Sequence, residues 1–314
     1  MNLTKNRSYI LYSLIFLLFA ISAYLAHISA SSLNHHLTMV AGFIFMCLIG
    51  KLDANTWFHR IGATIFVVSV LLLVLILLTP DANRSTSCSL MLGGMKIEPM
   101  AFFAVGTAWL IGWLYSIQND VKRVNIALFA LMIGTAIFCI KVNDMRALPM
   151  LEAFFLAWLF YINGISKVSI ASLLISLGSG IFFILSSSHR MTRITIWWES
   201  PSDLMTTLSA DLNLHENILL ALIDNLGYFT FSVVVLLFFV LSYILFTCKY
   251  KNRYYQLFAI GIVFLILIDL GLNIVYVFGL SPLYPPSLYL FEYGNSVALT
   301  SFIMMGMLMM GIEK

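Results

Sequence analysis

The sequence has little charge: only 10% of its 314 residues are Asp, Glu, Lys or Arg, whereas 61% are hydrophobic. A soluble globular domain carries about 25% charged residues, so this composition excludes that class and a disordered chain. The net charge is only +3, and the basic residues are not clustered, which excludes a nucleic-acid binder. The four cysteines have no CxxC or metal-ligand spacing, so no disulfide framework is readable.

Long apolar runs occupy most of the chain. A helix needs about 20 mostly apolar residues to cross a bilayer core about 30 Å thick. Ten runs meet this requirement, with the second at the lower limit of length: 8–28, 37–50, 59–79, 97–117, 123–141, 147–165, 167–186, 217–247, 254–280 and 289–311. The pattern predicts an all-α polytopic membrane protein with about ten transmembrane helices, and residues 1–314 are expected to form a single transmembrane domain.

The distribution of Lys and Arg predicts the orientation of these spans, because cytoplasmic loops carry an excess of both. With the N-terminus in the cytoplasm, 11 of the 17 Lys and Arg residues lie inside and 6 lie outside. An even number of spans returns the C-terminus to the cytoplasm. The largest outer loop is then about 187–216, and the protein is expected to be a multi-pass protein of a bacterial cytoplasmic (inner) membrane.

Acidic residues are concentrated on the predicted outer face, although they do not set topology. Longer and more polar outer loops would produce the same skew. Arginines share that face: Arg190 and Arg193 follow the seventh run, and a continuing helix would place them on one side. Guanidinium groups suit phosphate or pyrophosphate. The alternative is that both arginines contact lipid headgroups.

Several carboxylates could carry chemistry. Glu216 begins the eighth run, at a helix N-terminus that favours its ionised form, where it could act as a general base or merely stabilise the helix. Glu152, Asp224 and Asp269 fall within runs, where a charge needs a partner or a wet cavity. Each could instead hold helices together. Glu98 precedes a proline that suits the first turn of the fourth helix.

The order of short motifs along the spans resembles the SEDS family of polytopic membrane proteins, which includes RodA, FtsW and SpoVE. Five short stretches of the family have counterparts here in the same order. They are Gln-Pro-Ser-Glu, Pro-Asp-Leu-Gly-Thr, Arg-Val-Leu-x-Phe, Glu-Glu-Leu-Gly and Ser-Tyr-Gly-Gly-Ser. The matching positions are 94–99, 143–145, 193–197, 226–227, and, as the most specific block, Asn273, Pro282, Leu288, Tyr293, Gly294 and Ser296.

This resemblance implies a peptidoglycan glycosyltransferase that joins lipid II, or another undecaprenyl-linked sugar, on the outer face of the membrane. It also implies a class B penicillin-binding protein as partner, besides membrane lipid, and no nucleic acid. An ungapped alignment places Glu216 on the family's catalytic Asp, whereas alignment by His215 would place Asn217 there. The residues predicted to bind substrate are Arg190, Arg193, Asp144, Glu98, Asp203, Tyr293 and Ser296.

The leaving pyrophosphate needs positive charge, which the arginines or a divalent cation (Mg²⁺ or Mn²⁺) would supply. No cofactor is otherwise expected. The chain also departs from the family. Apolar Met100, Ala101 and Ala104 stand where the family has Ser, Glu and Lys, and the largest outer loop is shorter before Glu216 than it is in the family. The alternatives are therefore a catalytically degenerate scaffold or regulator of a cell-wall synthase, or a transporter of a lipid-linked sugar.

Overall fold

The fold was analysed in a computed structural model. It describes residues 3–28, 33–78, 89–92, 95–117, 121–142, 144, 146–186, 188–199, 218–281, 287–291 and 295–313. Ten helices among these residues are apolar, six of them at least 18 residues long and four shorter. Each overlaps one of the ten runs, so the predicted all-α polytopic class is confirmed, with six helices long enough to cross a membrane and four shorter apolar helices that bring the number to about ten.

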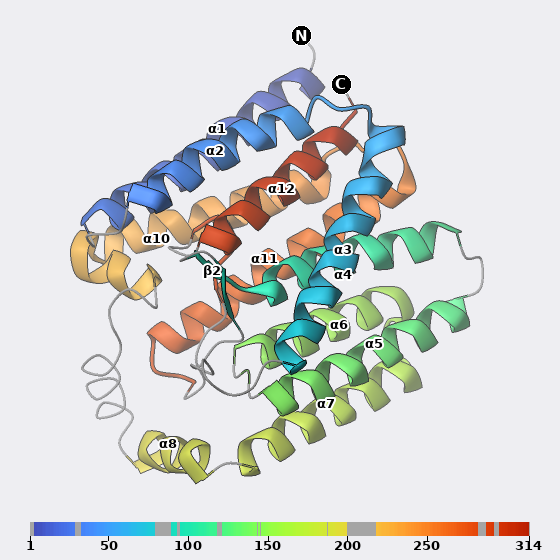
Figure 1. Cartoon of the computed structure of the whole chain (residues 1–314), viewed down its shortest axis with the longest axis vertical. Helices are drawn as coiled ribbons and strands as arrows, with labels where there is room; N and C mark the ends of the chain where they lie inside the picture. Colours follow the sequence, from blue (N-terminus) through green and yellow to red (C-terminus); the bar gives the residue numbers. More distant parts are fainter. Residues whose placement is uncertain are drawn as a thin grey trace.

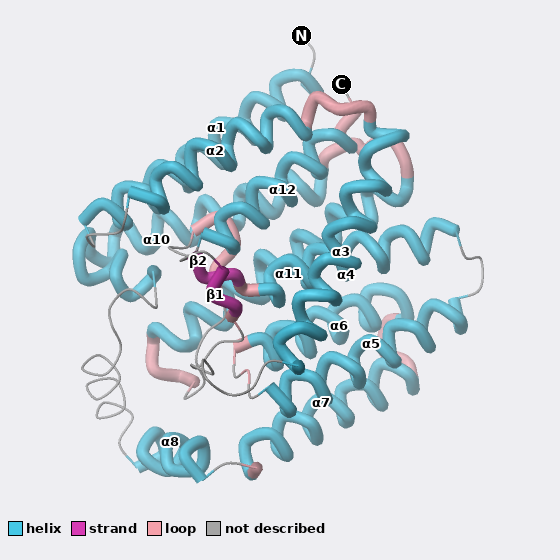
Figure 2. Tube along the Cα trace, in the orientation of Figure 1, coloured by secondary structure: helices cyan, strands magenta, loops and turns pink. Residues whose placement is uncertain are grey.

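The ten apolar helices and one polar helix follow one another along the chain, with a short hairpin before α4 (Figures 1 and 2). The N-terminal half contains α1 (Leu3–Ile28), α2 (Leu33–Ile49), α3 (Ala54–Leu78), β1 (Leu90–Leu92), β2 (Met95–Ile97), α4 (Pro99–Ile117), α5 (Val121–Val142) and α6 (Ala147–Asn163). The C-terminal half contains α7 (Lys167–Leu185), α8 (Ser188–Glu199), α10 (Ile218–Thr247), α11 (Arg253–Val277) and α12 (Asn295–Gly311).

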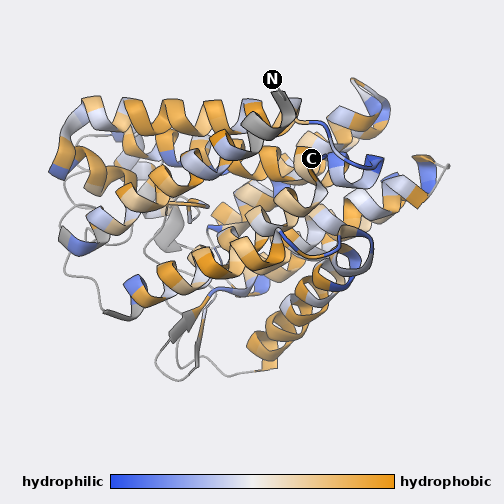
Figure 3. Cartoon of the chain, turned by 90° about the horizontal axis from the view of Figure 1, so that it is seen from above, coloured by the Kyte–Doolittle hydropathy of each residue, from blue (hydrophilic) through white to orange (hydrophobic). Residues whose placement is uncertain are grey.

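Most of these helices run side by side along one common direction (Figure 1). The helices α4, α11 and α12 form the centre, because buried side chains occur on every side of them. The helices α1, α2 and α10 pack on one side of this centre, and α5, α6 and α7 lie on the other. Apolar residues extend along the helices while hydrophilic ones gather at their ends and in loops (Figure 3), as expected for helices that span a bilayer.

Close helix packing in the centre depends on small residues, as is common in membrane proteins. At Gly106 on α4, an added Cβ would lie 2.8 Å from the backbone Cα of Phe66 on α3. No ordinary side-chain contact is that short, so only glycine permits this approach. By contrast, a Cβ at Gly178 on α7 would meet nothing within 4 Å.

Both chain termini lie at the same end of the bundle (Figure 1). The C-terminal residues pair with the connection between α10 and α11: the Lys251 N–H donates to the Gly311 carbonyl (3.0 Å), and the Glu313 N–H donates to the Lys249 carbonyl (3.0 Å). At the same end, Asp53 caps α3 by accepting from the N–H (3.1 Å) and the hydroxyl (2.7 Å) of Thr56. The excess of Lys and Arg in the loops at this end assigns it to the cytoplasm.

Three local features differ from a plain series of spans. The last helix begins at Asn295 rather than at 289, because 287–291 forms a non-helical segment. The α8 helix is separate from α7 and lies at the end of the bundle opposite the termini (Figure 1). Within α10, Gly227 has φ 79° and ψ 171°, a conformation that is essentially restricted to glycine and that divides the helix in two.

Candidate functional site

A polar junction joins β2, α4 and α12 at the end of the bundle that is predicted to face outward. The backbone N–H of Glu98, just before α4, donates to the hydroxyl of Ser296 in the first turn of α12 (3.1 Å). The Ser287 hydroxyl donates to Oε2 of Glu98 (3.0 Å). Glu98 and Ser296 were both predicted to bind substrate, and the structure brings them together across 198 positions of sequence.

The segment 287–291 is fixed to this junction by hydroxyl groups. The Tyr289 hydroxyl donates to the carbonyl of Ala101 on α4 (2.9 Å), and the Leu290 N–H donates to the hydroxyl of Ser301 on α12 (2.9 Å). Leu290 has a positive φ of 68°, which is strained for a residue with a branched side chain. These contacts therefore hold the backbone in an otherwise unfavourable conformation.

The surroundings of Tyr289 strengthen the preference of its phenol for the neutral form. Burial raises the pKa of the Tyr289 phenol well above its usual value, and the nearby carboxyls of Asp269 and Glu98 raise this pKa further. The phenol thus remains a hydrogen-bond donor at physiological pH. It is a positioning group for the segment that carries Ser287, because its own hydrogen bond goes to backbone.

A cavity of about 260 Å³ lies beside the junction, between α2, β2, α4 and α12. Its polar lining includes Thr38, Asn295 and Ser296, and Nδ1 of His35 lies 3.3 Å from Oδ1 of Asn295. Pockets that enclose a drug-sized ligand measure about 300–1,000 Å³. This cavity can therefore hold a single polar group or part of a chain, but not a whole disaccharide.

Asp144 lies between α5 and α6, and only 4% of its surface is exposed. Its Oδ1 accepts from the N–H groups of Arg146 (3.0 Å) and Ala147 (3.1 Å), and its own N–H donates to the Cys139 carbonyl (3.0 Å). These contacts give the carboxylate a role in starting α6. Its predicted contact with substrate stays a prediction.

The other predicted site residues lie wholly or partly outside the described part of the structure. Arg190 and Arg193 both lie in α8, three residues apart on one helix, but their side chains are outside the described part of the structure. Glu216, Asp203 and Tyr293 lie outside the described residues altogether. The α8 helix is nevertheless tied to the bundle, since Nε1 of Trp197 donates to the carbonyl of Gly279 beyond α11 (2.6 Å).

The three carboxyls within spans have different surroundings. Asp269 is fully buried on α11, beside an Asn273 amide that donates to its backbone carbonyl (2.8 Å). Glu152 is 5% exposed, and its Oε1 lies 3.1 Å from the Ser179 hydroxyl in a cavity of about 320 Å³ between α6 and α7. Asp224 is exposed on the part of α10 that precedes the glycine break. Asp269 is near Tyr289 of the junction, since its carboxyl affects the pKa of that phenol, whereas Glu152 lines a separate cavity.

Sequence reasoning did not single out Ser287, Tyr289 or Ser301. The hydrogen-bond partners of these hydroxyls depend on tertiary packing, which no short motif predicts. The structure also shows that the three apolar replacements on α4, Met100, Ala101 and Ala104, are buried. Among the described residues, no three His, Cys, Asp or Glu side chains converge on a point that could hold a metal.

Comparison with known proteins agrees with this arrangement of helices. The chain is 22% identical over 336 aligned positions to the probable peptidoglycan glycosyltransferase FtsW of Helicobacter pylori, covering 86% of this chain and 85% of the relative. The crystal structure of the rod shape determining protein RodA of Thermus thermophilus matches with a TM-score of 0.71 at 15% identity, covering 96% and 94% of the two chains. A chain from a structure described as a peptidoglycan synthase complex matches with a TM-score of 0.76 at 14% identity, covering 96% of both.

The fold therefore defines a polytopic membrane protein of the RodA type. The family model named for FtsW, RodA and SpoVE, described as cell cycle protein, matches residues 7–209 and 213–313. Because this match covers nearly the whole sequence, the chain belongs to the FtsW/RodA/SpoVE family, also called SEDS. The resemblance drawn from the short motifs is thereby confirmed, and membership implies a bacterial membrane.

Proposed function

We propose that this chain is a peptidoglycan glycosyltransferase that polymerises lipid II on the outer face of the bacterial cytoplasmic membrane. The observation that carries the proposal is the family match over nearly all of its spans. A relative named as a probable peptidoglycan glycosyltransferase supports it, as does a similar chain in a peptidoglycan synthase complex. The polymer would serve the cell wall in elongation, division or sporulation.

The proposed reaction transfers a growing glycan from its lipid pyrophosphate to the sugar hydroxyl of an incoming lipid II. The acceptor hydroxyl loses its proton to the carboxylate of Glu216 as the new glycosidic bond forms. The bond to the pyrophosphate breaks, and this leaving group takes the electron pair. Arg190, Arg193 or a divalent cation would stabilise its charge.

In this proposal the junction of Glu98, Ser287 and Ser296 provides polar groups on the same face as the reaction. The hydroxyls and the carboxylate can exchange hydrogen bonds with a sugar, and the adjoining cavity can accept one group of it. Asp144, Asp203 and Tyr293 would contribute further contacts. A class B penicillin-binding protein is the proposed partner, because the product strands must be crosslinked.

A second function is a scaffold that regulates a cell-wall synthase without catalysis. One observation favours it: Met100, Ala101 and Ala104 are buried at positions where the family has polar groups, and Ala104 has no exposed surface. The first turns of α4 therefore lack the hydrogen-bonding side chains that the family has there. A transporter of lipid-linked sugar has less support, since Asp269 is packed within protein rather than along an open path.

Lipid II polymerisation by the purified full-length protein, with and without a class B penicillin-binding protein, separates the first two functions. We expect glycan strands from the natural protein and a loss of at least 100-fold in rate for Glu216→Gln, since removing a general base typically costs about 10²–10⁴-fold. Glu199→Gln is the matched control, because it removes an exposed carboxylate from the outer face at a residue that has no role in the proposed reaction.

Equal activity of Glu216→Gln and the control would exclude Glu216 as the base. No product from the natural protein, when a known family member polymerises lipid II in the same assay, would support the scaffold instead. Binding of the penicillin-binding protein by the inactive chain would then identify its role.

A further inference from the structure

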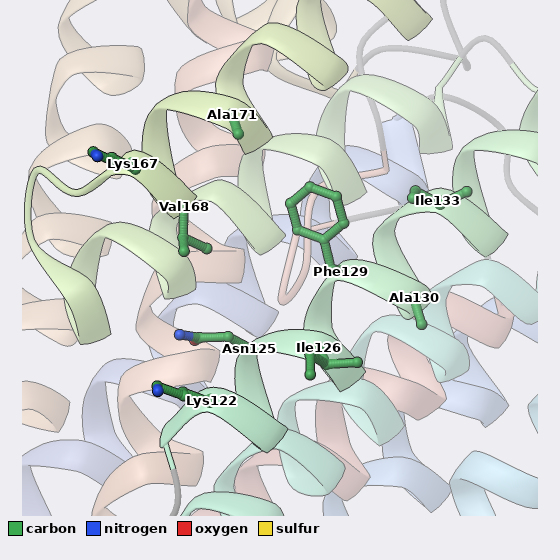
Figure 4. Close-up of a pocket in the computed structure, with 9 residues that line it drawn as sticks. All are labelled: Lys122, Asn125, Ile126, Phe129, Ala130, Ile133, Lys167, Val168 and Ala171. Carbon is green, nitrogen blue, oxygen red and sulfur yellow. The ribbon is translucent and has the colours of Figure 1, made fainter.

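A groove separates α5 from α7 on the surface that faces the membrane. It encloses about 660 Å³, and its walls are apolar side chains of both helices. The side-chain nitrogens of Lys122, Asn125 and Lys167 lie along one side of the groove, while Phe129 and Ile133 continue away from them (Figure 4). The groove thus combines a polar head with an apolar body.

The length of the groove matches one leaflet of a bilayer. Lys122 and Ile133 are separated by eleven residues of α5, which corresponds to about 16 Å at a rise of about 1.5 Å per residue. The hydrocarbon core of a bilayer is about 30 Å thick, so one leaflet contributes about half of it. A single acyl chain can therefore lie along the groove from the lysine end to the middle of the membrane.

Both lysines lie at the end of the bundle that is predicted to face the cytoplasm. Lys122 is the second residue of α5, and Lys167 is the first residue of α7. Neither helix contains an Asp or Glu, and the carboxyl of α6, Glu152, lies near the other end of that helix. In the sequence Asp120 precedes Lys122, but Lys122, Arg123 and Lys167 outnumber it, so the ends of α5 and α7 at the lysine end of the groove carry a net positive charge.

Asn125 is held in a fixed orientation between the two lysines. Its amide donates to Oδ1 of Asn163 on α6 (2.8 Å) and accepts from Nδ2 of that residue (3.0 Å). A side-chain amide has two N–H donors, and this reciprocal pair uses one of them. The second can be directed toward an oxygen between the lysines.

We propose that this groove binds an anionic phospholipid of the cytoplasmic leaflet. Its phosphate would lie between the ammonium groups of Lys122 and Lys167, with the Asn125 amide as a third donor, and one acyl chain would cover Phe129 and Ile133. Basic pockets between transmembrane helices at the cytoplasmic side are a known way to recognise anionic headgroups. This site lies at the opposite face of the membrane from the proposed site of polymerisation.

Lysines at a helix end also reach into the interface without binding any particular lipid, so the test must separate a site from general attraction. Native mass spectrometry of the purified full-length protein would measure retention of phosphatidylglycerol, phosphatidylcholine with the same acyl chains, and inorganic phosphate. The variant Lys122→Gln/Lys167→Gln removes the proposed headgroup contacts. The variant Lys51→Gln/Lys249→Gln removes the same charge elsewhere on the same face and is the matched control.

We expect the natural protein and the control to retain one phosphatidylglycerol. The groove variant should bind it about 25-fold more weakly, at about fivefold for each lysine. Ala171→Trp, an exposed position in the groove, fills the apolar part without changing charge and should also release the lipid.

Equal weakening in both lysine variants, or equal retention of phosphatidylcholine, would overturn the proposal in favour of non-specific attraction. Unchanged binding by Ala171→Trp would show that no acyl chain occupies the groove, and binding of inorganic phosphate with the same affinity would show a simple anion site. Thermal unfolding of each variant in lipid-free detergent checks that its fold is intact.

Discussion

Replacing Ser301 by alanine tests how the segment 287–291 is held against α12. The Ser301 hydroxyl donates to the carbonyl of Val297 (2.8 Å) and accepts from the N–H of Leu290 (2.9 Å). It has no exposed surface. In Ser301→Ala, the Leu290 N–H loses this acceptor in a buried site, and such a loss costs about 1–3 kcal/mol.

The matched control is Ser232→Ala on α10. The Ser232 hydroxyl also donates to the carbonyl four residues earlier, at Tyr228 (2.9 Å), but it is exposed and accepts no described backbone bond. Substitutions at such surface positions usually change stability by less than about 0.5 kcal/mol. The difference between the two variants therefore isolates the bond to Leu290.

Hydrogen–deuterium exchange of a peptide covering 287–291 is the direct measurement. Each 1.4 kcal/mol is a factor of ten in an equilibrium constant, so 1–3 kcal/mol corresponds to exchange about 5- to 150-fold faster in Ser301→Ala. Ser232→Ala should exchange as the natural protein does. Identical exchange in all three proteins would refute the claim that Ser301 holds the strained Leu290 backbone.

Further predictions concern helix contacts and buried charge. Gly106→Ala should lower the Tm in detergent, since overpacking typically costs about 1–3 kcal/mol, whereas Gly178→Ala should not; equal Tm values would contradict the close approach of α3 and α4. Hydrogen bonds lower the pKa of Asp53, so its contribution to stability is complete above the unfolded pKa of about 3.9 and is lost as pH falls through the lower folded value. The Tm difference between the natural protein and Asp53→Ala should thus disappear at low pH. A difference that persists there would show that the ionised carboxylate is not the source of the stabilisation. Glu152→Leu should raise the Tm without changing polymerisation, because it removes a buried polar group from the membrane, and a lower Tm would show that the contact with Ser179 is stabilising.

Hydropathy was sufficient to predict the spans because bilayer thickness dictates their length. It misplaced the start of the last helix, since Leu288, Tyr289, Leu290 and Phe291 form an apolar run that is buried in protein rather than in lipid. Run length does not distinguish these two apolar environments. The strands β1 and β2 have three residues each, which is too short for an alternating pattern to be detected.

The candidate site was predictable only in part. Glu98 and Ser296 were found because each lies in a short motif at the outer end of a span, and their contact follows from α4 and α12 being neighbours. Ser287 and Ser301 were not found, because a serine in an apolar protein carries no signal for its acceptor. Glu216 remains a prediction that rests on the ungapped alignment with the family's catalytic Asp, because its place before a helix is equally consistent with a charge that only stabilises the helix.

The break at Gly227 has a consequence for the orientation of the helix end that follows Glu216 in the sequence. The outer part of α10, residues 218–226, is anchored by the buried side chains of Ile218, Leu219 and Leu222. It joins the inner part through two dihedral angles at one residue, and a Cβ there would meet no neighbour within 4 Å. The φ and ψ angles of Gly227 therefore set the direction of the helix end that precedes it, so the backbone geometry at this one residue contributes to the direction from which Glu216, two residues before Ile218 in the sequence, enters the helix.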